Sequence, residues 1–285
     1  MRRVVVFALT TLAMAVLAPA VSVTERTARA DEVAPELETL DLRQKAQTEA
    51  KKLLGALPAN DQRRLTGLYL AFDPSPSDPS AMVACDDDGD YVIVITDAML
   101  RLASIVARAQ SYDDVNGSRS IEDYAGFIAR SQLPARRLLP PPPGFYTAQK
   151  AGTTHDVRLR EAIAFVVARE LTHFRAGDLV CPHPTATHEN GDDEWTSSEQ
   201  RRALERASSI YPGRATERDI EATTRVLDAG HSEQGALGLL RFFNQLELER
   251  TIHAPRFFST YWALHPSAVA RTAAVKTAAK DHRSE

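Results

Sequence analysis

The chain has 285 residues, of which 44% are hydrophobic and 25% are charged, as in an ordinary globular protein. Its formal net charge is −4, and loss of residues 1–30, which hold four basic residues and one acidic residue, leaves −7. This negative charge argues against nucleic acid or an anionic membrane surface as a partner. The roughly 255 residues that remain suit a single domain with a sizeable core.

Residues 1–30 have the composition of a secretory signal peptide. A short basic start precedes an apolar run from Val4 to Leu17, and small-residue cleavage patterns end at Ala20 and Ala30. The apolar run is short for a membrane span, so an uncleaved anchor is the alternative. We therefore expect an exported protein, periplasmic or secreted, with no membrane span beyond the signal segment.

The pattern of apolar and turn-forming residues divides the remainder into an N-terminal helical region at 31–66 and a second domain at 67–285. In chain order the expected elements are a helix at 37–57, strands at 68–72, 81–85 and 91–96, and helices at 97–110, 121–131, 159–178, 196–209, 216–229, 233–250, 259–265 and after Pro266. The sequence Tyr211-Pro212-Gly213 is expected to break the chain between two of these helices.

The segment near 111–154 is expected to be an insertion. It contains four consecutive prolines from Pro140 to Pro143, which favour polyproline II and cannot enter a sheet. We expect it to form a rigid surface connection, and the alternative is an arm over a cleft.

The helix at 159–178 carries Arg169-Glu170-Leu171-Thr172-His173, which differs from the zinc-protease pattern H-E-x-x-H only at its first position. In the intact pattern two histidines at i and i+4 bind one metal ion, and the glutamate is the general base toward the metal-bound water. By itself, this segment favours a core helix that happens to contain a glutamate and a histidine.

Further segments follow in a fixed order. Glu217 and Glu221 share a helix face, Asp228-Ala229-Gly230-His231 forms a helix end, and residues 265–271 read His-Pro-Ser-Ala-Val-Ala-Arg. With the helix motif, this order resembles peptidase family M forty-eight, the gluzincins that include HtpX-like and CAAX prenyl proteases. Their hallmarks are H-E-x-x-H, E-x-x-x-D on the next helix and a late H-P-x-x-x-x-R, and the resemblance spans roughly Leu68 to Val275.

The resemblance implies a helix-rich α+β metallopeptidase domain with a small antiparallel sheet, whose edge strand pairs with an extended substrate. It also implies roles for individual residues: Glu170 as general base, His173 and Glu217 as zinc ligands, His265 near the metal, Glu221 behind the ligands, and Arg271 as support for the oxyanion.

Arg169 departs from this pattern. A guanidinium has no lone pair to give to zinc, and its positive charge repels a divalent cation. We expect zinc binding to be lost or weak and Arg169 to form a buried ion pair with Glu217 or Glu221. The first hypothesis is therefore a catalytically impaired relative that binds or scaffolds a protein or an extended peptide.

Two other hypotheses remain open. One is an active metalloendopeptidase in which His265 joins His173 and Glu217 as a replacement ligand. The other is a chaperone-like module that binds extended peptides on the edge strand.

The only two cysteines, Cys85 and Cys181, are expected to form a disulfide in an exported protein, with two free thiols as the alternative. His183 and His188 lie in a polar loop. They are candidate metal ligands, although solvent-facing loop histidines are commoner.

Overall fold

The computed structural model describes residues 23–65, 68–86, 89–146, 153–181, 197–253 and 257–284. The chain divides into two compact units, residues 1–38 and 39–285. Residues 1–22, most of the expected signal segment, lie outside the described residues. Within the described ranges, no helix is both long enough and apolar enough to cross a membrane.

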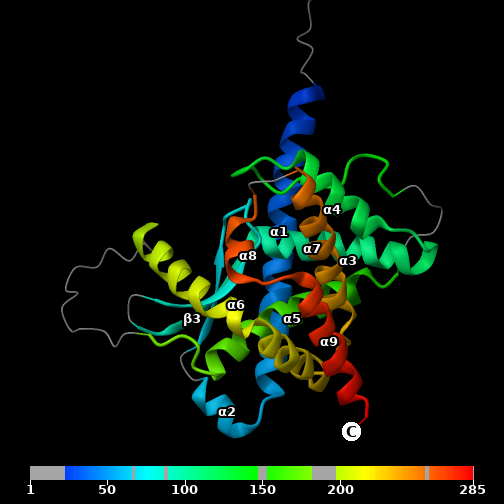
Figure 1. The fold of residues 1–285 in the computed structure, drawn as a ribbon. Helices are drawn as coiled ribbons and strands as arrows, with labels where there is room; N and C mark the ends of the chain where they lie inside the picture. The colour runs from blue at the N-terminus through cyan, green and yellow to red at the C-terminus, as the bar shows by residue number, and fades with distance from the viewer. Residues whose placement is uncertain are drawn as a thin grey trace, which may run out of the picture. The chain divides into compact units, whose positions relative to one another are not determined.

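The chain folds as a helix-rich α+β protein, which confirms the expected fold class (Figure 1). Its helices are α1 (Val23–Gly55), α2 (Ala59–Arg64), α3 (Asp97–Asn116), α4 (Ser120–Ser131), α5 (His155–Arg175), α6 (Ser197–Asp228), α7 (Gln234–His253), α8 (Ser259–Leu264) and α9 (Ala268–His282).

A three-stranded sheet has the order β1-β3-β2, with β1 (Tyr69–Asp73), β2 (Ala81–Cys85) and β3 (Tyr91–Thr96). Strand β2 is antiparallel to β3, but β1 is parallel to β3, so the sheet is mixed and the expectation of an antiparallel sheet was wrong. The antiparallel pairing needs only the short turn after Cys85. The chain reverses direction between β1 and β2, and β3 lies between these two strands. Strands β1 and β2 are therefore the two edges of the sheet.

Helix α5 is the centre of the second unit. It packs against α3, α6 and α7 and against strands β2 and β3. Its residues from Ala162 to Ala168 are all buried, because neighbours cover every side of the helix. At Gly235 of α7 a Cβ would lie 2.3 Å from the backbone nitrogen of Ala162, so only glycine permits this approach of α7 to α5.

The segment expected as an insertion contributes to the core. Helix α3 continues to Asn116 and ends at Gly117, which has a φ of 64°. Helix α4 then packs against α7 and buries Tyr124, whose hydroxyl donates to the carbonyl of Leu139. The backbone N–H of Leu138 also donates to the Pro76 carbonyl, so the chain is fixed just before the proline run.

Helix α6 is continuous through Pro212, and the expected break at 211–213 was wrong. Proline removes one backbone hydrogen bond from the interior of a helix, but here Tyr211 and Ala215 on either side of it are buried. Burial of this face holds the two halves in line. Helix α2 begins after Pro58 without a side-chain cap.

Candidate functional site

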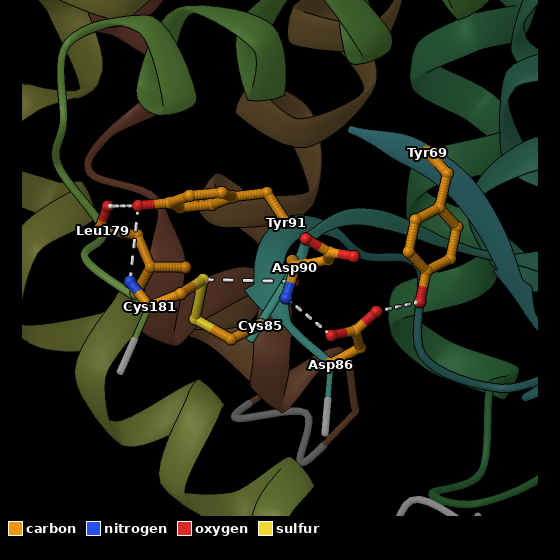
Figure 2. The surroundings of a disulfide bond; sticks show 7 residues. All are labelled: Tyr69, Cys85, Asp86, Asp90, Tyr91, Leu179 and Cys181. Carbon is orange, nitrogen blue, oxygen red and sulfur yellow. Dashed lines mark hydrogen bonds between the residues drawn. A yellow bond between two sulfur atoms is a disulfide. The ribbon is translucent and has the colours of Figure 1, made fainter. Parts of the chain in front are cut away.

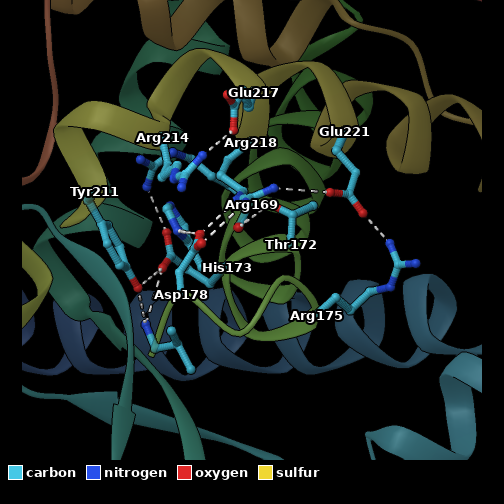
Figure 3. Close-up of polar contacts among 12 residues, drawn as sticks. Arg169, Thr172, His173, Arg175, Asp178, Tyr211, Arg214, Glu217, Arg218 and Glu221 are labelled. Carbon is cyan, nitrogen blue, oxygen red and sulfur yellow. Dashed lines mark hydrogen bonds and ion pairs between the residues drawn. The ribbon is translucent and has the colours of Figure 1, made fainter. Parts of the chain in front are cut away.

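The candidate site lies where α5 meets α6 and the edge strand β2 (Figure 3). Arg169, Glu170 and His173 of α5 are 3%, 1% and 0% exposed. Burying such groups is costly unless each finds a charged or hydrogen-bonding partner. The partners therefore define what the site can do.

Arg169, which departs from the expected zinc motif, forms a buried ion pair, as expected, but with other partners than expected. Its Nη1 donates to Glu170 Oε1 at 2.9 Å, and its Nε lies 3.4 Å from Asp219 Oδ1. Glu217 and Glu221, the expected partners, take no part. The guanidinium carbon also lies 5.5 Å from the ring centre of Tyr211, in the range of a cation–π contact.

Glu170, expected as general base, accepts hydrogen bonds at both of its carboxylate oxygens. Its Oε2 accepts hydrogen bonds of 3.1 Å from the Val83 backbone N–H and from the Tyr211 hydroxyl. Burial raises the pKa of Glu170, while the charge of Arg169 and these hydrogen bonds oppose the rise. The N–H of Val83 belongs to edge strand β2, so Glu170 occupies the hydrogen-bonding position that an added peptide strand would need.

His173 is held in one orientation by two contacts. Its Nδ1 lies 2.8 Å from Asp178 Oδ2, and its ring stacks on Tyr211 with the centroids 3.6 Å apart. Burial and then the charge of Arg169 lower the pKa of His173 to about 3, so the ring is neutral. Because Asp178 is ionised, Nδ1 carries the proton and donates it, which leaves a lone pair on Nε2.

Asp178 in turn is held by Arg218 of α6 through hydrogen bonds of 2.7 and 3.0 Å. Burial acts to raise the pKa of Asp178, but its hydrogen bonds with Arg218 and His173 outweigh this effect and hold the pKa below its usual value. The segment after α5 is thereby tied to α6.

Arg271 does not point toward an open reaction site. It binds Asp219 through two hydrogen bonds of 2.7 and 2.9 Å and donates to the Tyr261 hydroxyl at 3.1 Å. This paired geometry, in which both carboxylate oxygens meet one guanidinium, is the strongest form of such an ion pair. Asp219 is therefore shared by Arg271 and Arg169.

His265 is buried beside these charges, and its ring lies 4.3 Å from that of Tyr261. Burial and then the charges of Arg169 and Arg271 lower its pKa well below the usual value, so it is neutral. Its Nδ1 and the Nε2 of His173 are both buried without a hydrogen-bond partner among the described residues.

Glu217 and Glu221 lie away from this cluster (Figure 3). The Glu217 side chain is 58% exposed and pairs with Arg214 of its own helix. Glu221 pairs with Arg175 of α5, which also binds Asp61 of α2, so this network joins three helices near the surface. His183 and His188 lie outside the described residues.

The expected disulfide between Cys85 and Cys181 is present (Figure 2). It joins the end of β2 to the segment that follows α5. The Tyr91 hydroxyl lies beside the same segment, where it donates to the Leu179 carbonyl and accepts from the Cys181 N–H. These bonds fix the loop that carries Asp178, and through it the orientation of His173.

The donors in this cluster do not fit a zinc ion. Zinc needs three or four imidazole, thiolate or carboxylate donors that converge on one point. Here the cations among the acidic groups are the Arg169 and Arg271 guanidiniums, and the charge of Arg169 acts on both neutral histidines. Among the residues that the structure describes, no group of three or more His, Cys, Asp or Glu side chains is arranged to hold a metal ion.

The sequence interpretation missed Asp219, Tyr211, Asp178 and Tyr261. A signal for Asp219 was available, because Tyr211, Ala215, Ala222 and Val226 form the apolar face of α6, and Asp219 lies in phase with them. A buried aspartate in that phase requires a cationic partner. For Asp178 and Tyr261 the sequence held no comparable signal.

Comparison with known proteins gives no further guide, since no protein-family model, no curated protein and no solved structure matches this chain significantly.

Proposed function

We propose that this chain is an exported, non-catalytic relative of zinc metallopeptidases that acts by binding or scaffolding protein. The observation that carries the proposal is the position of the Arg169 guanidinium, which neutralises Glu170 and shares Asp219 with Arg271. A fixed positive charge takes the role that a metal cation has in the enzymes, and it holds α5 to α6 and β2. It supplies no site for activating water.

A second position supports the loss of metal binding. The resembling family has the pattern E-x-x-x-D on this helix. The buried aspartate of α6 is Asp219, so we match it to the aspartate of that pattern. The glutamate position, four residues earlier, is then Ala215. Aligned in this way, the first and third ligand positions are Arg169 and Ala215, neither of which can bind zinc. Glu217, the ligand expected from sequence, is on the surface.

The feature of the resembling family that remains is the set of contacts that orients a metal-binding histidine. His173 keeps the arrangement of a metal-binding histidine, with Nδ1 on a carboxylate and Nε2 unpartnered. This favours descent from an enzyme. An active metallopeptidase that uses His265 would require the Arg169 guanidinium to leave its two carboxylates, which is costly for a buried charge.

The test is a peptidase assay in the presence of zinc, with the variant Arg169→His/Ala215→Glu as the positive comparison. The proposal expects no cleavage of an unfolded protein substrate by the natural chain, with or without added zinc. Zinc-dependent cleavage by the natural chain, abolished in Glu170→Gln, would overturn it in favour of the rearranged site.

The chaperone-like alternative is supported by a different edge of the sheet. At β2 the Val83 N–H is already bonded to Glu170, whereas no residue of β1 is buried. An extended peptide that adds to the sheet should therefore slow amide hydrogen exchange in residues 69–73 and leave 81–85 unchanged. Slowed exchange in neither strand would remove this candidate.

A further inference from the structure

A small cavity lies against Arg169. Its volume is about 30 Å³, and its polar lining consists of Arg169, Glu170, Tyr261, His265 and Arg271. Apolar side chains, among them Val166 and Leu240, complete the wall. A space of this size holds one or two small molecules of the size of water and no larger metabolite.

The groups that line the cavity are rich in hydrogen-bond donors. The Nη2 of Arg169 is buried and has no hydrogen-bond partner among the described residues. The Tyr261 oxygen accepts from Arg271, and no bond from its own O–H is found in the described part of the chain. On the acceptor side, Glu170 Oε1 already receives Arg169 Nη1, and the Nδ1 of neutral His265, unpartnered within the described ranges, offers an N–H or a lone pair depending on its tautomer. A ligand that only accepts hydrogen bonds satisfies these donors better than water does.

We propose that this cavity is a binding site for a small monovalent anion, a halide or a short carboxylate, held by Arg169. The guanidinium N–H groups supply charge-assisted hydrogen bonds, and the apolar wall limits the size of the anion. The substitution of arginine for histidine would thus turn a cation-binding position into an anion-binding one. The inference rests on the cavity and on Arg169, and it holds whether or not the chain descends from a peptidase.

Two carboxylates, Glu170 and Asp219, already balance the two guanidiniums. An added anion therefore gains attraction chiefly from the nearest unpaired N–H groups, and we expect binding in the roughly millimolar range. An anion that binds the folded chain alone raises the melting temperature, by about 3–5 °C at a concentration about ten times Kd.

The experiment measures the melting temperature in chloride, formate and methanesulfonate at constant ionic strength. Ala81→Val, which adds two methyl groups at the cavity wall, is compared with Ala84→Val on the same strand, which overpacks the core elsewhere. In the natural chain and in Ala84→Val, we expect chloride or formate to raise the melting temperature in a saturable way relative to methanesulfonate. In Ala81→Val we expect this rise to be lost. Which of the two anions acts distinguishes a halide from a carboxylate ligand.

Equal melting temperatures in all three salts would overturn the proposal and indicate ordered water in the cavity. An undiminished rise in Ala81→Val would also overturn it, because the anion would then bind elsewhere. If Ala81→Val does not fold, a carboxylate series in the natural chain decides: the rise must disappear between formate and butanoate. A rise that persists with butanoate contradicts a cavity of this size.

Discussion

Replacement of Arg169 by Met should destabilise the fold severely, because it leaves Glu170 buried without its cation. Removing one partner of a buried ion pair costs about 3–5 kcal/mol. Glu170 keeps its hydrogen bonds from Val83 and Tyr211, and Asp219 keeps both bonds from Arg271. We therefore expect the lower end of this range, about 3 kcal/mol at pH 7.

The charge of Arg169 also opposes the raised pKa of Glu170. Without that charge the pKa of Glu170 rises further, so the carboxyl can take up a proton and limit the loss. The destabilisation by Arg169→Met should accordingly shrink as the pH falls below neutrality, because the protonated acid is cheaper to bury.

The double variant Arg169→Met/Glu170→Gln should lose less stability than the sum of the two single variants, with a coupling of about 1–3 kcal/mol. Arg160→Met is the matched control, since Arg160 lies on the same helix but its pair with Asp156 is half-exposed. Its cost should be below about 1 kcal/mol.

Urea denaturation followed by circular dichroism measures these differences as changes in midpoint at constant m-value. Equal costs for Arg169→Met and Arg160→Met, or strictly additive effects of Arg169→Met and Glu170→Gln, would refute the buried charge cluster.

Three further results are expected. Arg169→His alone should not bind zinc, because Glu217 is on the surface. In calorimetry Arg169→His/Ala215→Glu should bind zinc, and Arg169→His/Ala215→Gln should bind it less tightly. Equal binding by all three variants would show that Ala215 does not face the site. The pKa of His173 falls from 6.5 to about 3 on folding, so the unfolded chain binds more protons between these values, and stability should fall by about 3 kcal/mol between pH 7 and pH 4. In His173→Phe, which keeps a ring on Tyr211, stability should fall less steeply over the same pH range. An unchanged slope would assign the effect to other groups. Intact mass under non-reducing conditions should show no free thiol, and two alkylatable thiols would contradict this. The variant Cys85→Ser/Cys181→Ser should lose about 2–4 kcal/mol of stability, since the bond closes a loop with a sequence separation of 96.

Local patterns in the sequence were sufficient for most elements. The strands at 81–85 and 91–96 have the predicted bounds, because short β-branched and apolar runs between turn residues leave little choice. The parallel pairing of β1 with β3 was not predictable, since alternation within a strand carries no information about its partner. The predicted helix break at Pro212 was wrong for a related reason. The low helix propensity of this one residue was outweighed by packing of the helix face around it.

The candidate site shows the same division. The sequence indicated that Arg169 must find buried carboxylates, because guanidinium cannot lose its charge. It did not indicate which carboxylates, because Glu217 and Glu221 lie on one face of the helix and Asp219 lies with Ala215 on another. Spacing alone does not say which of these faces meets α5. The choice depends on which face of α6 meets α5, and burial of Tyr211 and Ala215 decides it for Asp219.

The most direct test of the central claim is the zinc content of the chain, purified without chelators, equilibrated with zinc and then washed. If the Arg169 guanidinium has replaced the metal, elemental analysis should find far less than one zinc per chain, and a chelator should leave the melting temperature unchanged. About one tightly held zinc per chain, with a melting temperature that falls on chelation, would contradict the account.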